Sequence, residues 1–277
     1  ESMSNAPQLL MGQRKGKKMG DSKLVDSMIH DGLWDVYNNM HMGNTGEVVA
    51  RECSIDRGQA DAFSVQSHLK AAKAWGEGWF DWETFALEIP QRRGDPVLLE
   101  RDEGIRADSS VEHLSTLRTV FDKDGIVTAG NASTLNDGAS AVLVTSEEFA
   151  KEQGWEIIAT IEDYCTAGVE PERVMSAPIP AVKNLLERNN LDVLDVDVYE
   201  HNEAFASASC AVAQEVGIPH DRFNLHGGAV SLGHPLGSSG TRCLITMLGV
   251  MRRLEAESGI VTLCLGGGNA VAMYLRR

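Results

Sequence analysis

Residues 195–216 read DVDVYEHNEAFASASCAVAQEV, and they predict a short strand that passes through a polar turn into a helix. Residues 195–200 are interpreted as a strand, and the Ala-rich residues 203–216 favour a helix. Polar groups at the carboxyl end of a strand in an α/β sheet are the usual place for ligand binding. Asn202 is equally suited to cap the helix. The residues alone therefore leave a functional site and an ordinary helix cap open.

Strands and helices are predicted to alternate on the C-terminal side of residue 140, which indicates a layered α/β domain. The strands are expected at 141–144, 156–162, 260–265 and 270–275, and the helices at 178–189 and 238–257. On the N-terminal side we expect helices around 21–38, over 54–76 and over 109–119, with short strands at 86–93 and 97–101.

Composition restricts the class of protein. The chain has 277 residues, 43% of them hydrophobic, which is sufficient for a large core and favours two domains over one. The formal net charge of −15 argues against nucleic acid or an anionic membrane as the main partner. No apolar run approaches the roughly 20 residues that span a bilayer, and the polar N-terminus does not resemble a signal peptide. The basic run is interpreted as a solvated loop: Arg14, Lys15, Lys17 and Lys18.

The five cysteines are irregularly spaced and include no CxxC pair. This pattern disfavours a disulfide framework and a structural zinc site, so no metal is predicted. It fits a reducing compartment, and we expect a cytoplasmic protein. The chain begins with Glu1 rather than Met, which we interpret as a processed product or one segment of a longer polypeptide.

Two further segments are rich in glycine. Residues 226–242 place His234 between Gly233 and Pro235 before a predicted helix, which restricts the direction of the ring. Residues 264–269 place Cys264 at a strand end beside three glycines, where exposed N–H groups can hold an oxyanion. A structural histidine and a buried cysteine at a tight turn are the ordinary alternatives.

Four motifs together resemble the thiolase family over essentially the full chain. They are Asn202-Glu203-Ala204-Phe205, Gly233-His234-Pro235, Cys264-Leu265-Gly266-Gly267-Gly268, and Ala129-Gly130-Asn131-Ala132-Ser133 followed by Asn136-Asp137-Gly138-Ala139. In addition, His41-Met42-Gly43 resembles the loop of biosynthetic acetoacetyl-CoA thiolases. The chain departs from the family at Asn269-Ala270, where a further glycine pair is frequent, and at His113, where a CoA-contacting serine is common.

This resemblance implies a layered α/β/α fold with an inserted, mostly helical loop domain. Residues 1–123 would be the loop domain that binds CoA and substrate. Residues 124–152 would end the N-terminal thiolase half, and 153–277 would form the C-terminal half. Most of the N-terminal half-domain would lie outside this chain.

The resemblance also implies residue roles in a reversible Claisen condensation of two acetyl-CoA to acetoacetyl-CoA plus CoA. Cys264 would be the acid/base, and His234 would stabilise the thioester oxygen and activate the nucleophile. Asn202 would hold a water at that oxyanion site, and the Gly266 N–H would belong to a second one. Arg106 would lie by the adenine of CoA. The other residues that would contact the CoA thioester are Leu117, Ala129, Ser133, Met175, Phe205, His41 and Met42. No tightly bound cofactor is implied, because CoA thioesters are the substrates.

The acyl-accepting cysteine of the family lies upstream of a segment that resembles residues 1–7, and none of the five cysteines has the matching context. We therefore expect a companion N-terminal segment of about 100 residues that carries it, a size set by the missing half-domain. We also expect a homodimer or homotetramer, because residues 8–19 resemble the exposed loop that tetramers use.

Three alternatives remain at this stage. One is a degradative 3-ketoacyl-CoA thiolase of broader chain length, and another is a non-catalytic thiolase-like protein that binds acyl-CoA. The third is a generic nucleotide-binding α/β domain, which the lack of a phosphate-loop motif disfavours. A catalytic thiolase requires that Asn202, His234 and Cys264 lie within reach of one substrate.

Overall fold

A computed structural model describes all residues 1–277. Its centre is a four-stranded sheet in the order β7 (Thr160–Gly168), β10 (Asn269–Arg276), β9 (Ser258–Leu265) and β8 (Val198–His201). β8 and β9 are parallel, whereas β10 is antiparallel to both β7 and β9. The parallel pair places the carboxyl ends of β8 and β9 at the same edge of the sheet.

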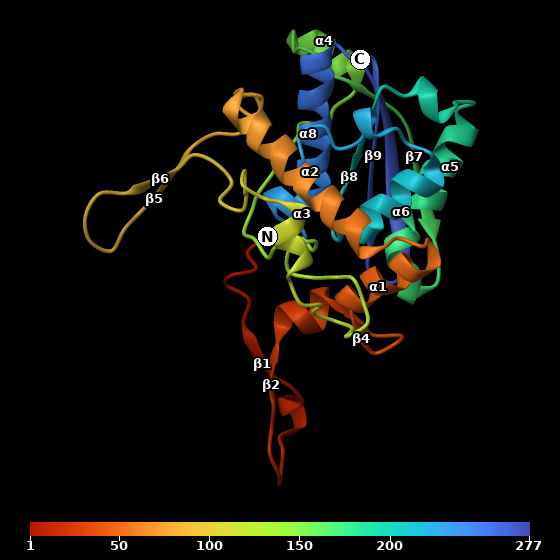
Figure 1. The fold of residues 1–277 in the computed structure, drawn as a ribbon. Helices are drawn as coiled ribbons and strands as arrows, with labels where there is room; N and C mark the ends of the chain where they lie inside the picture. Colours follow the sequence, from red (N-terminus) through yellow and green to blue (C-terminus); the bar gives the residue numbers. More distant parts are fainter.

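Helices cover both faces of this sheet, as Figure 1 shows. On one face, α5 (Pro178–Arg188) and α6 (Ala206–Val216) share a core with Tyr199 and Ile260. On the other face, α8 (Ser239–Leu254) packs on Val198 and Val261. Neighbouring strand residues thus enter opposite cores, as the two-residue period of a strand requires. The expected layered α/β/α fold is confirmed.

Two helices of the N-terminal part lie beside α6. α1 is Met42–Glu52, and α2 is Arg57–Gly76. The Asp56 side chain accepts from Gln59 N and the Gln59 side chain accepts from Asp56 N, so a capping box begins α2. The expected helix over 54–76 therefore exists but begins at Arg57. Ser54 is excluded by its positive φ of 56°.

Two hairpins extend away from the body in Figure 1. One pairs β1 (Gln8–Leu10) with β2 (Leu24–Asp26), and the other pairs β5 (Leu87–Ile89) with β6 (Val97–Leu99). The latter confirms the short strands expected near 86–101. The remaining short elements are a 3-10 turn at Gln13–Lys15, a π turn at Met28–Gly32, β3 (Trp34–Asp35), β4 (Met40–His41) and α3 (Val111–Ser115).

The helix expected around 21–38 is wrong. The chain there forms β2, one π turn and β3 in succession. Asp26 accepts from the backbone N–H of Met28, and Asp35 accepts from that of Tyr37. Short acidic side chains that bond to nearby backbone compete with helical hydrogen bonds, which accounts for the interrupted structure. The helix expected over 109–119 is likewise reduced to α3.

The buried strand expected at 141–144 is also wrong. Residues 134–146 form no strand, and Leu143 and Val144 are 75% and 67% exposed. A strand needs a neighbour for its backbone N–H and C=O groups, and no part of this chain pairs with the segment. α4 (Glu147–Gln153) follows, and the strand expected at 156–162 begins at Thr160 as β7.

The other expected elements of the C-terminal part are confirmed, with shifts of a few residues at their ends. Val193–Asp195 is a 3-10 turn, so the strand expected from 195 begins at Val198. The helix expected from 203 begins at Ala206, because Phe205 is its extended N-cap residue. Three short helical segments complete the fold: Pro171–Ser176, His220–Arg222 and α7 (Ala229–Leu232).

Candidate active site

Asn202 and His234 meet at the carboxyl end of β8. Asn202 follows the last residue of that strand, and its backbone N–H donates to Thr262 O on β9 at 3.1 Å. His234 lies between α7 and α8, and Gly233 before it has a φ of 94°. Asn202 Nδ2 lies 3.2 Å from His234 Nε2. The structure thus brings together two expected catalytic residues that are 32 positions apart.

The hydrogen bonds around His234 favour one tautomer. Its Nδ1 lies 2.6 Å from Ser239 Oγ, and this hydroxyl donates to Pro235 O at 2.9 Å. Because the single hydroxyl proton of Ser239 is used there, its oxygen accepts from Nδ1–H. The Nε2 atom then keeps its lone pair and accepts from the Asn202 amide. A histidine in this form can act as a base at Nε2.

Burial keeps His234 neutral. Burial and, to a smaller extent, the nearby Arg242 guanidinium together lower the pKa of the imidazole to about 4. Both effects disfavour a second positive charge in a site that is shielded from water. His234 is therefore unprotonated at neutral pH.

Cys264 lies at the end of β9, at the neighbouring strand end. Its Sγ is 3.8 Å from Met175 Sδ, and it packs on an apolar cluster that includes Met175 and Phe205. Burial raises the pKa of the thiol to about 11, although the residue as a whole keeps some exposure. Cys264 is therefore a neutral thiol at rest, and its thiolate is a strong base.

The glycines after Cys264 form a tight turn between β9 and β10. Gly267 and Gly268 have φ values of 80° and 88°, and a Cβ on Gly268 would overlap Val169 O. No atom lies within 4 Å of the place where a Cβ of Gly266 would be. The space beside the predicted oxyanion residue Gly266 is therefore open.

Most of the expected CoA-contacting residues surround this apolar cluster. Met42 packs on the same cluster as Met175 and Phe205. The His41 ring stacks on Phe121 at 4.7 Å, and Phe121 in turn contacts Phe205 edge to face at 6.3 Å. Ser133 also lies here, because its N–H donates to Ala204 O at 3.0 Å.

Three expected residues, Leu117, Ala129 and Arg106, do not belong to this apolar cluster. Leu117 and the exposed Ala129 flank Gly130, where a Cβ would lie 2.6 Å from Leu117 Cδ1. Arg106 is exposed, and its backbone N–H donates to His68 Nδ1 on α2 at 3.2 Å. The structure places no direct contact between Arg106 and either Cys264 or His234.

Comparison with known proteins decides the family. Residues 1–148 match the N-terminal domain of thiolase, and residues 155–277 match its C-terminal domain. The chain belongs to the thiolase family. It is an acyltransferase of the acetyl-CoA C-acyltransferase type, as expected.

Relatives of this thiolase are longer than the chain. It is 49% identical over 277 residues to an acetyl-CoA acetyltransferase of Cupriavidus necator, covering 100% of the chain and 70% of that protein. A probable acetyl-CoA acyltransferase of Staphylococcus aureus is 47% identical with the same coverage.

The fold of this chain is similar to that of solved thiolase structures. The acetyl-CoA acetyltransferase of Bacillus anthracis superposes with a TM-score of 0.96 at 37% identity, over 100% of this chain and 70% of that one. Human mitochondrial 3-ketoacyl-CoA thiolase in complex with CoA gives 0.94 at 34% identity, over 99% and 68%.

Sequence reasoning missed the charged groups of the thiolase site. Arg242 lies in the first turn of α8, and its guanidinium donates to the carboxylate of the fully buried Glu200 at 3.1 Å. Its Nη2 also lies 2.9 Å from Cys243 Sγ. The available signal was an arginine followed by the uncharged residues 243–251 of the same helix, because a buried guanidinium needs a carboxylate.

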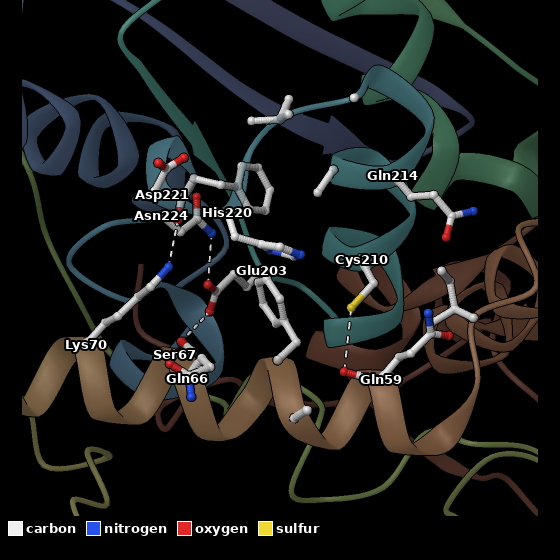
Figure 2. Close-up of a pocket in the computed structure, with 17 residues that line it drawn as sticks. Gln59, Gln66, Ser67, Lys70, Glu203, Cys210, Gln214, His220, Asp221 and Asn224 are labelled. Atoms are coloured by element: carbon white, nitrogen blue, oxygen red, sulfur yellow. Dashed lines mark hydrogen bonds between the residues drawn. The ribbon is translucent and has the colours of Figure 1, made fainter. Parts of the chain in front are cut away.

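The cavity in Figure 2 is separate from the reaction site. It has a volume of about 920 Å³ and lies between α2, α6 and residues 217–224. Neither Cys264 nor His234 lines it, although Glu203 reaches it from the Asn202 turn. No group of three or more His, Cys, Asp or Glu side chains in the chain is placed to hold a metal ion. None of the helices has the length and apolar character of a membrane-spanning segment.

Proposed function

We propose that this thiolase catalyses the reversible condensation of two acetyl-CoA to acetoacetyl-CoA, and that the chain supplies the acid/base and oxyanion groups. The observation that carries the proposal is the pairing of Asn202 with the Nε2 of a neutral His234 beside the strand end that bears Cys264. Claisen chemistry develops negative charge on a thioester oxygen, and it requires donors fixed beside that oxygen.

In the first half of the proposed reaction, an acyl-accepting thiol attacks acetyl-CoA. His234 Nε2 takes the proton of that thiol, and Cys264 gives its own proton to the departing CoA thiolate. A neutral imidazole and a neutral thiol are the required starting forms, and burial keeps both groups in them. The step leaves an acyl thioester, an imidazolium and the Cys264 thiolate.

In the second half, the Cys264 thiolate removes a methyl proton from a second acetyl-CoA. The enolate oxygen faces the His234 N–H and a water on Asn202, and the enolate carbon attacks the acyl group. The released thiolate regains its proton from His234, while Cys264 keeps the methyl proton. Every group then returns to its starting form. The raised pKa of Cys264 supports this role, because the α-proton of a thioester is a weak acid.

We propose that the acyl-accepting thiol comes from a companion N-terminal segment. Cys243 is fully buried, and burial raises its pKa to about 12, so it is a poor nucleophile. Cys53 is the C-cap of α1, Cys165 lies on β7 and Cys210 lies on α6, and none of the three bonds to the ring of His234. Apolar side chains that a half-domain would cover remain exposed at Val142, Leu143, Val144, Ile157 and Ile158.

The short-chain substrate is proposed from the loop that begins α1. The ring of His41 packs against Phe121, and a Cβ on Gly43 would overlap that same ring. The Phe121 ring in turn contacts Phe205, and we propose that these packed rings limit the substrate to a small acyl group. A preference for long 3-ketoacyl-CoA would support the degradative alternative instead.

The test is to co-express residues 1–277 with the N-terminal 30% of the Cupriavidus necator relative, which the chain does not cover. We expect thiolysis of acetoacetyl-CoA by this assembly, and faster turnover of it than of 3-ketooctanoyl-CoA. A companion whose cysteines are replaced by alanine should be inactive. Activity that survives in that control would overturn the assignment of the nucleophile.

A further inference from the structure

Glu203 is a fully buried carboxylate that no cation contacts directly. Its oxygens accept from Ser67 Oγ at 2.6 Å, Asn224 Nδ2 at 2.8 Å and Val230 N at 3.1 Å. Figure 2 shows the first two bonds, which reach Glu203 from α2 and from the loop after residue 220. Donors from α2 and from the stretch 224–230, which are far apart in sequence, therefore converge on one side chain.

Two of these donors, Asn224 and Val230, belong to segments that lead to a catalytic residue. Asn224 accepts from His201 N at 2.8 Å and donates to His201 O at 2.9 Å, which fixes the residue directly before Asn202. Val230 belongs to α7, which ends at Leu232 and is followed by Gly233 and His234. The carboxylate thus joins the turn of Asn202 to the helix that precedes His234.

The packing around the carboxylate leaves little freedom. A Cβ on Gly228 would lie 2.6 Å from Glu203 Oε1, so the backbone approaches the side chain as closely as a glycine permits. Gly228 N donates to Ser67 Oγ at 3.2 Å, and Ser67 Oγ also lies 3.0 Å from Ser231 Oγ on α7. Residues 228–231 are therefore held to α2 as well as to Glu203.

Space filling alone does not explain a carboxylate here. All three partners are donors, and only a side chain with two acceptor oxygens satisfies them together. The amide of a glutamine would turn its NH₂ group towards at least one donor. Burying a carboxylate without a cation is costly, so a residue needed only for volume would favour an apolar side chain.

We propose that Glu203 is a positioning residue, which sets the distance between Asn202 and His234 by holding α7 against the end of β8. The inference rests on the proposed function, because it assigns the pair to the oxyanion of the condensation. Glu203 does not touch the reacting atoms in this role. It acts through His234, and its loss should impair turnover rather than substrate binding.

The primary test is Glu203→Gln in the co-expressed assembly. We expect kcat for condensation to fall by about 100-fold, the order expected for a small displacement of a catalytic group, with KM changed by less than about threefold. The matched control is Glu215→Gln on the exposed side of α6, which should leave both constants unchanged. An unchanged kcat, or a loss confined to KM, overturns the proposal.

A double variant separates positioning from general damage. In a His234→Ala background, Glu203→Gln should lower kcat by less than about twofold further, because residues that act as a unit are not additive. An equal loss in both backgrounds overturns the proposal. If Glu203→Gln fails to fold, Ser67→Ala removes one donor from the same carboxylate and should lower kcat by about tenfold at constant KM.

Amide hydrogen exchange gives a readout that does not depend on activity. Exchange over residues 228–234 should accelerate in Glu203→Gln and not in Glu215→Gln. Unchanged exchange shows that Glu203 does not hold α7, which overturns the inference. An assembly that is inactive in its unsubstituted form contradicts the proposed function, while the exchange measurement still reports on Glu203.

Discussion

At the residue scale, burial sets the starting protonation state of the site. It lowers the pKa of His234 to about 4 and raises that of Cys264 to about 11, so both side chains are neutral over the physiological range. The causes are alike, because burial disfavours the charged form of either group. A base and an acid are thereby kept ready at adjacent strand ends.

The first residue-scale prediction concerns Cys264→Ser in the co-expressed assembly. Condensation should fall by roughly 10²–10⁴-fold, the usual contribution of a positioned acid/base, because a hydroxyl is far harder to deprotonate than a thiol. Cys53→Ser, at the end of α1, should retain activity. The measurement is the initial rate of acetoacetyl-CoA formation, and equal losses in the two variants contradict the role of Cys264.

The second residue-scale prediction concerns the pH dependence of kcat/KM. The folded pKa of His234 is depressed from 6.5 to about 4, so the neutral base persists as pH falls through 6.5 and is lost only near 4. The acid limb of kcat/KM should therefore be absent between about pH 7.5 and 5.5, since that profile reports groups of the free enzyme. A limb centred near 6.5 that disappears in His234→Gln contradicts this prediction.

At the scale of elements, the turn between β9 and β10 determines where Cys264 and Gly266 lie. Gly268 needs both its positive φ of 88° and the space beside Val169 O. Gly217 at the end of α6 is a matched control, since it has a φ of 86° and no neighbour within 4 Å of a Cβ. An alanine at Gly217 would suffer backbone strain alone, whereas an alanine at Gly268 would suffer backbone strain and steric overlap. Comparing the two variants therefore measures the cost of the overlap.

We therefore predict that Gly217→Ala costs about 1–2 kcal/mol of unfolding free energy, from the left-handed backbone alone. Gly268→Ala should cost about 1–3 kcal/mol more, because the added methyl also overlaps the chain. It should also lower activity, since the turn carries the catalytic strand end. Denaturant unfolding of the co-expressed assembly measures both values, and equal costs contradict the steric argument.

At the scale of the whole molecule, the exposed apolar residues between 142 and 158 predict dependence on the companion segment. The chain expressed alone should aggregate, because this surface and the unpaired residues 141–144 attract other chains. Co-expression should give a soluble homo-oligomer, with the β1–β2 hairpin free to contact another copy. Light scattering measures both outcomes, and a folded, monodisperse and fully active chain without the companion contradicts the first.

The elements that the sequence predicted well are those whose signal is local. The helices over 178–188 and 239–254 follow from apolar spacing, and that over 206–216 follows from its many alanines. The strands β9 and β10 follow from apolar runs on either side of one glycine turn. The helix predicted for residues 21–38 is absent because Asp26 and Asp35 accept hydrogen bonds from the adjacent backbone, which apolar spacing does not reveal. The strand predicted for residues 141–144 is absent because an apolar run forms a strand only where another strand is present to pair with it.

By itself, the sequence determined the layered fold, the family and the identity of Asn202, His234 and Cys264 as candidates, because motif order and residue type are written along the chain. Only the tertiary structure decided that His234 Nε2 faces Asn202 and that Arg242 pairs with Glu200. It also assigned Ser67, Asn224 and Val230 to Glu203. These partners are separated by up to 136 residues, and the direction of a hydrogen bond depends on how the strand ends and helices pack.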